Sequence, residues 1–203
     1  MKWAPNMPES TDRKASPETG ESRALELFSR VRRGDRGAFS ELYKQYHPRL
    51  FGYLLRVLAN PATVEEVLDD VMFVVWKDAR KFRGRAAVST WIFGIAYRKA
   101  LTAIRKDRRY QSGLDRGAEV DAIAGESPQY AEWIRAGLHQ LSPDHRQVLE
   151  LTYYGGFSYQ EIAEIAGCPV NTVKTRMFHA RRRLKVLLPA LAGPTQDQRR
   201  ERS

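Results

Sequence analysis

Apolar residues recur at helical spacing along most of the chain. From about residue 35 to residue 58 they follow the i, i+3, i+4 and i+7 rule, which places them on one face of a helix. Similar patterns predict helices over about 22–34, 63–81 and 89–108. The strict two-residue alternation of a half-buried strand is missing from the sequence. The first half of the chain therefore predicts one compact helical unit.

A second set of helices follows after an interruption. Residues 109–128 carry glycines, a proline and charges but few large apolar groups, which is typical of a linker. Beyond them the pattern predicts helices at about 130–140, 143–153, 158–166 and 170–188.

Residues with capping chemistry support several of these boundaries. Ser22, Asp35 and Ser142 each stand where a side-chain oxygen can cap a helix, and Asn60 with Pro61 interrupts the second helical pattern.

The predicted fold class is all-α, with two small helical domains joined by a flexible linker. We predict a disordered arm at 1–21, a first domain at 22–108, an acidic linker at 109–128, a second domain at 129–188 and a disordered tail at 189–203.

The charge of the chain indicates which class of partner it binds. The 203 residues include 34 Lys and Arg against 24 Asp and Glu, a formal net charge of +10, which favours a polyanion such as nucleic acid or an anionic membrane surface. The cations gather in blocks: residues 81–109 hold nine basic residues and one acidic residue, whereas 110–132 hold one and five. No run approaches the ~18 apolar residues that span a bilayer, and no secretory signal pattern opens the chain. We expect a cytoplasmic protein without direct membrane insertion.

Enzyme chemistry finds little support in the sequence. Cys168 is the single cysteine, and the four histidines share no metal-ligand spacing. No nucleophile elbow, P-loop or dinucleotide fingerprint is present. We expect no catalytic residues, no metal and no cofactor.

The last two predicted helices form a helix-turn-helix pattern. Ser158 and Glu161 stand at capping-box positions, and the second helix carries six Lys and Arg between residues 170 and 188 without one acid. Such a helix fits the major groove of duplex DNA. The alternative is a solvated basic helix with no role in DNA binding.

The residues of this unit resemble a known family. Segments 156–163, 167–176 and 180–184 are similar to region 4 of extracytoplasmic-function sigma factors, although the unit alone also resembles LuxR-type effector domains. Many relatives carry arginine where this chain has His179. The resemblance implies contact with the promoter −35 element by Ser158, Tyr159, Thr172, Lys174, Thr175, Arg176, Phe178, His179, Arg181 and Arg182.

The helix predicted at 89–108 has a mixed face of aromatic, apolar and cationic residues. Trp91, Ile95, Arg98, Thr102, Arg105 and Lys106 share that face at 100° per residue. Unstacked bases can rest on Trp91 while the cations follow phosphates. The alternative is that Trp91 packs against the preceding loop as part of the core.

Residues 91–98 resemble the −10 recognition helix of the same family, although Arg98 replaces its common asparagine. The resemblance implies that the loop before this helix holds a flipped −10 base. The predicted −10 set is this face together with Arg83 and Arg85 of that loop.

The helix predicted at 63–81 is acidic in a basic chain. Its carboxylates lie mid-helix without a nearby histidine or glycine-rich loop, which disfavours metal binding or acid–base catalysis. A merely solvated acidic face is the alternative. Residues 64–76 resemble the segment with which the family docks on the coiled coil of the polymerase β′ clamp. That resemblance assigns polymerase binding to Glu66, Asp69, Asp70 and Phe73.

The chain is thus identified as a member of the small sigma factors. The resemblance implies core RNA polymerase as a partner, through the β′ clamp and the β flap, with duplex −35 and single-stranded −10 promoter DNA and an anti-sigma factor. A rival interpretation is an autonomous helix-turn-helix regulator whose N-terminal bundle dimerises. The acidic helix discriminates between them, because self-association does not require it.

Overall fold

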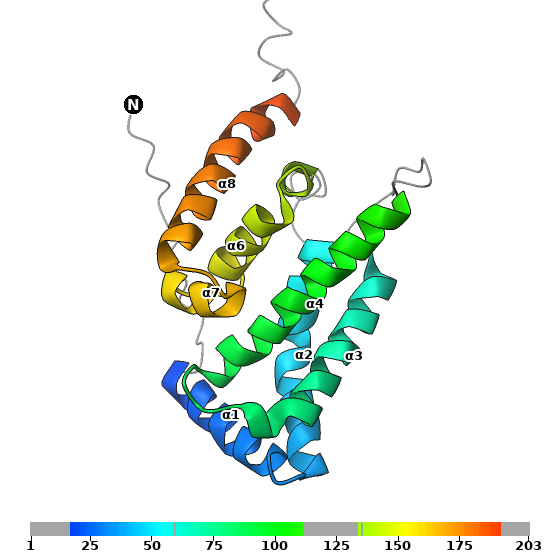
Figure 1. Ribbon diagram of the computed structural model, residues 1–203, viewed down its shortest axis with the longest axis vertical. Coiled ribbons are helices and arrows are strands. Elements are labelled where there is room, and N and C mark those ends of the chain that lie inside the picture. The colour runs from blue at the N-terminus through cyan, green and yellow to red at the C-terminus, as the bar shows by residue number, and fades with distance from the viewer. Residues whose placement is uncertain (1–16, 59, 112–133, 135, 192–203) are drawn as a thin grey trace, which may run out of the picture.

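The computed structural model describes residues 17–58, 60–111, 134 and 136–191 (Figure 1). All regular structure in these ranges is helical, as the sequence predicted. Residues 134 and 136–139 are helical, and the remaining elements are α1 (Pro17–Val31), α2 (Arg36–Leu58), α3 (Pro61–Asp78), the 3-10 turn η1 (Ala79–Lys81), α4 (Val88–Gln111), α6 (Pro143–Tyr153), α7 (Tyr159–Ala166) and α8 (Val170–Leu191).

Most of the predicted caps are present. The side chain of Asp35 accepts from the backbone N–H of Ala38 at 2.9 Å, and Ser142 accepts from His145 at 3.4 Å. Ser158 and Glu161 form the complete capping box at the start of α7. These side chains accept hydrogen bonds from backbone N–H groups that have no partner inside the helix, which is why the helices begin there.

Three predicted boundaries were wrong. Helix α1 begins at Pro17, so Ser22 is an exposed mid-helix residue and no cap. Its first turns are held by Glu21, which accepts from the backbone N–H of Val88 at 2.6 Å. Helix α4 extends three residues into the predicted linker, and α8 extends three residues into the predicted tail. The rest of the arm, linker and tail lies outside the described residues.

Helices α1 to α4 pack around one core, with α2 between α1 and α3. Their inward residues include Leu42, Tyr46, Leu50, Leu68 and Phe93, all close to fully buried. These residues match the apolar stripes of the sequence, so periodicity predicted this core correctly.

Helices α6, α7 and α8 form the second unit. Gly167 closes α7 with φ of 64°, a left-handed backbone that glycine adopts without steric cost. Ile162 and Ile165 of α7 pack with Val173 and Met177 of α8 in the buried seam of the helix-turn-helix.

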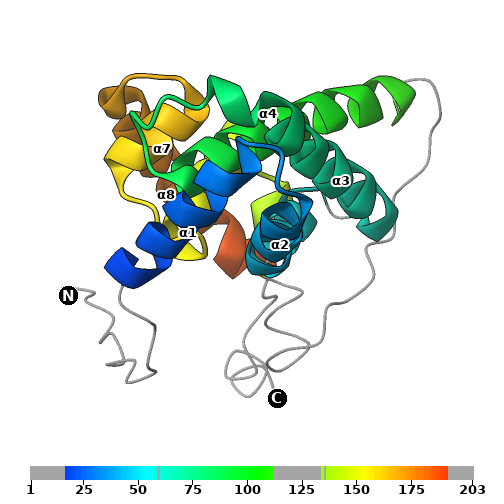
Figure 2. The same ribbon diagram turned by 90° about the horizontal axis from the view of Figure 1, so that it is seen from below.

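The two units form one continuous hydrophobic core. Helix α7 lies against α4, and α6 lies against α2 (Figures 1 and 2). The ring of Phe157, just before α7, meets Phe93 of α4 edge-on at 4.9 Å between centroids. The helical patterns of the sequence indicated two modules but contained no signal for this packing.

Candidate functional site

The outer face of α8 presents most of the predicted duplex-reading residues. Lys174, Phe178 and Arg181 follow each other at steps of four and three residues, and Thr175 lies three residues before Phe178; all four are exposed, so they share one face. Phe178 is 61% exposed among cations, an unusual position for an aromatic ring. Cations for phosphates and an apolar ring for a thymine methyl are what a major-groove helix uses. Of the other predicted residues, Ser158, His179 and Arg182 are also exposed, and Tyr159 and Thr172 are half-buried.

Arg176 differs from its neighbours on α8. Its guanidinium donates to a carboxylate oxygen of Asp144 at 2.9 Å and to the hydroxyl of Tyr97 at 3.4 Å. Burial raises the pKa of Tyr97 to about 12, and the carboxylate of Asp144 adds to that rise. The hydroxyl therefore stays protonated and donates to Asp144 at 3.1 Å.

The exposed side of α4 carries a cationic track. Arg98, Thr102, Arg105 and Lys106 are exposed along it, and Arg83 and Arg85 are exposed on the loop before the helix. The helix and the loop together present positive charge to solvent, which suits the phosphates of a single strand.

The apolar residues of the predicted −10 face of α4 are less accessible than the sequence predicted. Ile95 is 5% exposed, so its expected accessible position on the cationic face was wrong. Helix α7 covers this part of α4: a β-carbon on Gly94 would lie 3.7 Å from the carbonyl oxygen of Ile165. Trp91 is half-buried and meets Phe28 and Phe82 edge-on at 5.3 and 5.6 Å between centroids. The structure therefore agrees with the alternative interpretation, in which Trp91 packs as part of the core.

Replacing Trp91 with alanine is expected to destabilise the fold by about 2–3 kcal/mol, because it removes both ring contacts and leaves a partial cavity. Thermal unfolding should show a melting temperature lower by roughly 4–12 °C. The matched control is Phe178→Ala, which removes an exposed ring and should shift the unfolding free energy by less than about 0.5 kcal/mol. Equal melting temperatures for the two variants would contradict a core role for Trp91.

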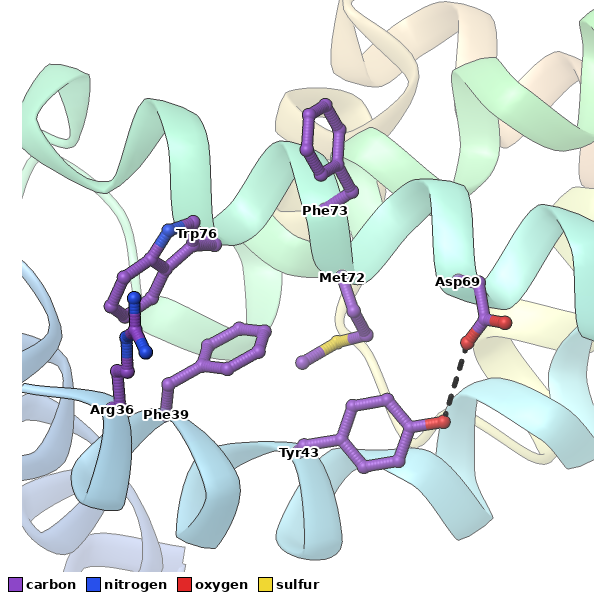
Figure 3. Close-up of a pocket in the computed structure, with 7 residues that line it drawn as sticks. All are labelled: Arg36, Phe39, Tyr43, Asp69, Met72, Phe73 and Trp76. Carbon is purple, nitrogen blue, oxygen red and sulfur yellow. Dashed lines mark hydrogen bonds between the residues drawn. The ribbon is translucent and has the colours of Figure 1, made fainter.

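The acidic face of α3 borders an apolar groove. Glu66, Asp69 and Asp70 are exposed, and Phe73 is 62% exposed. Asp70 pairs with Lys99 at 2.7 Å. Between α2 and α3 lies a groove of about 520 Å³ (Figure 3). Its lining consists of Arg36, Phe39, Tyr43, Asp69, Met72, Phe73 and Trp76.

The sequence did not predict this groove. Phe39 and Tyr43 belong to the apolar stripe of α2, which indicates core, whereas the structure leaves both half-buried at the groove. The hydroxyl of Tyr43 donates to Asp69 at 3.5 Å, so the groove reaches the acidic face (Figure 3). Burial raises the pKa of Tyr43, and the carboxylates of Asp69 and Glu65 raise it further. A surplus of aromatic residues on two adjoining helices was the one available signal.

Two further searches cover the described part of the chain. None of its helices has the length and apolar character needed to cross a membrane. Within the same ranges, no three His, Cys, Asp or Glu side chains are grouped so as to hold a metal ion.

Two family models match the chain. The model of Sigma-70 region 2 matches residues 42–110, and that of Sigma-70 region 4 matches residues 131–184. The first match spans α3, α4 and most of α2, and the second contains α6, α7 and the N-terminal part of α8.

Similar curated proteins include two bacterial sigma factors. The RNA polymerase sigma-H factor of Pseudomonas aeruginosa is 31% identical over 182 residues, covering 82% of this chain and 94% of the relative. The ECF RNA polymerase sigma factor SigK of Mycobacterium tuberculosis is 31% identical over 172 residues, covering 78% and 90%.

Two solved structures share the fold. The sigma factor RpoE in complex with the anti-sigma factor NepR from Bartonella quintana has a TM-score of 0.63 at 25% identity, covering 74% of this chain and 96% of that one. CnrH in complex with the cytosolic domain of CnrY has a TM-score of 0.66 at 22% identity, covering 83% and 98%.

Proposed function

Because the chain belongs to the extracytoplasmic-function group of sigma-70 RNA polymerase sigma factors, which direct promoter-specific transcription initiation, we propose that the surfaces described above select and open its promoters. The observation that carries this proposal is the occurrence, in order, of both sigma regions, each with its expected charged face exposed. The autonomous regulator is not favoured, since it accounts for neither the region 2 match nor the acidic face of α3.

Helix α8 is proposed to read the −35 element as duplex. Its N-terminal half, with Lys174, Thr175 and Arg176, enters the major groove, where side chains near a helix start reach base edges. Phe178 and His179 extend this contact, and Arg181 with Arg182 hold phosphates. Ser158, Tyr159 and Thr172 position the unit on the backbone.

The exposed side of α4 is proposed to hold the separated −10 strand. Arg98, Arg105 and Lys106 follow its phosphates, and the loop with Arg83 and Arg85 receives an extruded base. Ile95 is 5% exposed and does not belong to this surface.

The acidic face of α3 and the groove beside it are proposed to dock on the β′ clamp coiled coil of core polymerase. Carboxylates around an apolar groove offer steering charge together with a pocket for an apolar side chain. The second module is proposed to meet the β flap. An anti-sigma factor is a further proposed partner, and the site of action is the bacterial cytoplasm. The work done is binding and strand separation, without covalent chemistry.

The test is reconstitution with core polymerase. The tagged chain should co-purify with the core enzyme and produce transcripts from a random promoter library that share −35 and −10 motifs. Footprinting of DNA by the chain alone, with no association with core polymerase, would instead support the autonomous regulator.

Lys174→Ala is expected to weaken binding of the holoenzyme to its −35 duplex. A lost phosphate contact should lower the slope of log K against log salt by about 1, uniformly across sequences. A lost base contact should instead relax preference at one position by about 1–3 kcal/mol. Titration at several salt concentrations separates the two, with Lys44→Ala, an exposed lysine of α2, as the control. If both the affinity and the base preference are unchanged, α8 does not recognise the −35 element.

A further inference from the structure

Helix α1 is bonded to both ends of the loop that precedes α4 (residues 82–87), which we call the −10 loop. At the end of the loop, the backbone N–H of Val88 donates to one carboxylate oxygen of Glu21 at 2.6 Å, and the hydroxyl of Ser89 donates to the other at 3.3 Å. At its start, the ring of Phe82 meets Phe28 edge-on, with 5.0 Å between the centroids. Both ends of one short loop are therefore fixed to the same helix (Figures 1 and 2).

Glu21 supplies a helix cap that the local sequence of α4 lacks. The residue before α4 is Ala87, which has no side-chain acceptor, and the first turn of α4 contains no acidic residue. The first N–H groups of a helix have no partner inside it, and the positive end of the helix dipole favours a negative charge nearby. The carboxylate of Glu21 meets both needs from 67 residues away along the chain. Helix α1 therefore fixes where α4 begins and where the −10 loop ends.

The anchors of the −10 loop are buried, whereas its cations are exposed. Phe28, Phe82 and Val88 are each at most 5% exposed. Between the two anchored ends, Arg83 and Arg85 are exposed to solvent. A loop with fixed ends gives up fewer conformations when it binds a ligand, so less of the binding free energy is lost to ordering. The contacts with α1 thus prepare the −10 loop for binding.

Helix α1 lies outside both family matches. The region 2 match begins at residue 42, whereas α1 ends at Val31. None of the residues assigned above to DNA or to polymerase lies on this helix. Its contacts with the −10 loop therefore point to a role that neither family match indicates.

We propose that α1 supports the −10 loop and that Glu21 is a positioning residue, which holds the loop in the shape that receives an extruded base. Glu21 acts through the loop and not on the DNA, because its carboxylate is committed to Val88 and Ser89 and would repel a phosphate. The support of the loop is a property of the free chain, whereas its effect on base capture rests on the proposed function.

Hydrogen–deuterium exchange in the free chain tests the support directly. Glu21→Ala removes the acceptor, so the amides of the −10 loop and of Val88 should exchange about five- to tenfold faster, as expected for the loss of a helix cap. Glu21→Gln keeps an oxygen for Val88 and an amide group for Ser89, so its exchange should stay close to that of the wild type. Glu26→Ala is the matched control, because it removes an exposed carboxylate from the same helix.

Base selection by the holoenzyme tests the consequence for the promoter. The probe is a fork-junction DNA with a duplex −35 element and a single-stranded −10 segment, prepared with each of the four bases at each −10 position in turn. The wild type should prefer one base at the extruded position. Glu21→Ala should reduce that preference about three- to tenfold, and Glu21→Gln should retain it. Affinity for an isolated −35 duplex should stay unchanged, because α8 belongs to the other module.

Val64→Ala separates a destabilised chain from a misplaced loop. Val64 is fully buried near the start of α3, and the −10 loop follows the opposite end of that helix through η1. The variant should lower the melting temperature and leave the base preference at the wild-type level. Melting temperatures are measured for every variant, so that base preferences are compared at known stability.

Wild-type exchange of the −10 loop in Glu21→Ala would overturn the support by α1. A loss of base preference in Val64→Ala or Glu26→Ala equal to that in Glu21→Ala would show a general effect of stability or charge and overturn the positioning role. The same role is overturned if Arg83→Ala and Arg85→Ala change the base preference and Glu21→Ala does not. Faster loop exchange in Glu21→Ala, with a base preference that neither arginine variant changes, would uphold the support and reject the −10 role in the proposed function.

Discussion

Replacing Glu66 and Asp70 together with lysine is expected to weaken binding to core polymerase about 100-fold, with the fold intact. Both carboxylates are exposed on α3, so neither change disturbs the core. Two charge reversals on a docking face turn attraction into repulsion, at a cost of about 1.4 kcal/mol each. The new lysine at position 70 also faces Lys99, with which Asp70 now pairs at 2.7 Å, so the positive charge of the face increases further. Competition with a labelled wild-type chain for core polymerase measures the loss.

The matched control for this pair is Glu26→Lys with Glu41→Lys. These carboxylates are exposed on α1 and α2, and their reversal changes the net charge by the same amount. The control should compete almost as well as wild type. Comparable losses for the two double variants would mean that net charge, rather than the acidic face of α3, governs docking.

Arg56→Ala is expected to cost about 3–5 kcal/mol of the free energy that holds the modules together, because it leaves Glu150 buried without its ionic partner. Glu150 is 1% exposed. The guanidinium also lies over the ring of Tyr154 at 4.2 Å, a contact that the variant loses. Chemical denaturation measures the loss, and the variant should unfold at a lower denaturant concentration than the wild type.

The same variant should show a distinct pH dependence. Burial raises the pKa of Glu150, and Arg56 opposes that rise. Without Arg56 the folded-state pKa moves higher still, and an acid with a raised folded pKa contributes stability only where it is protonated. The deficit of Arg56→Ala relative to wild type should therefore be small below the ordinary glutamate pKa and grow as pH rises through the folded-state pKa. Denaturation at pH 4 and pH 8 compares the two.

Arg23→Ala provides the reference for these measurements. It removes an exposed arginine that pairs with exposed Glu41 at 3.2 Å, and such pairs contribute about 0–1 kcal/mol. A deficit for Arg56→Ala no larger than that of Arg23→Ala, and flat with pH, would contradict the role assigned to the buried pair.

Local chemistry explains which sequence predictions held. Asp35, Ser142 and Ser158 were identified as caps because a capping side chain acts on N–H groups two or three residues away. Glu66 and Phe73, which the family resemblance singled out, are both exposed on α3. The start of α1 was not predicted, because Glu21 is tied to Val88, 67 residues further along the chain.

The placement of Trp91 and Ile95 on α4 has a tertiary cause. A helical wheel separates faces but does not show what packs on each of them. Trp91 and Ile95 share a wheel face with Arg98, yet Phe28 and Phe82 contact the first and α7 covers the region of the second. A mixed wheel face predicted exposure correctly only where no neighbouring helix lies.

The helices, their main caps, the two modules and the family were predictable from the sequence, since these depend on residues close together in the chain or on motifs read in order. The groove between α2 and α3 and the packing of the two modules against each other are visible only in the folded chain. Tyr53 and Gln147 bond across 94 residues, and Arg176 and Tyr97 across 79. Such contacts depend on how two finished surfaces fit, and neither surface exists until its own helices have packed.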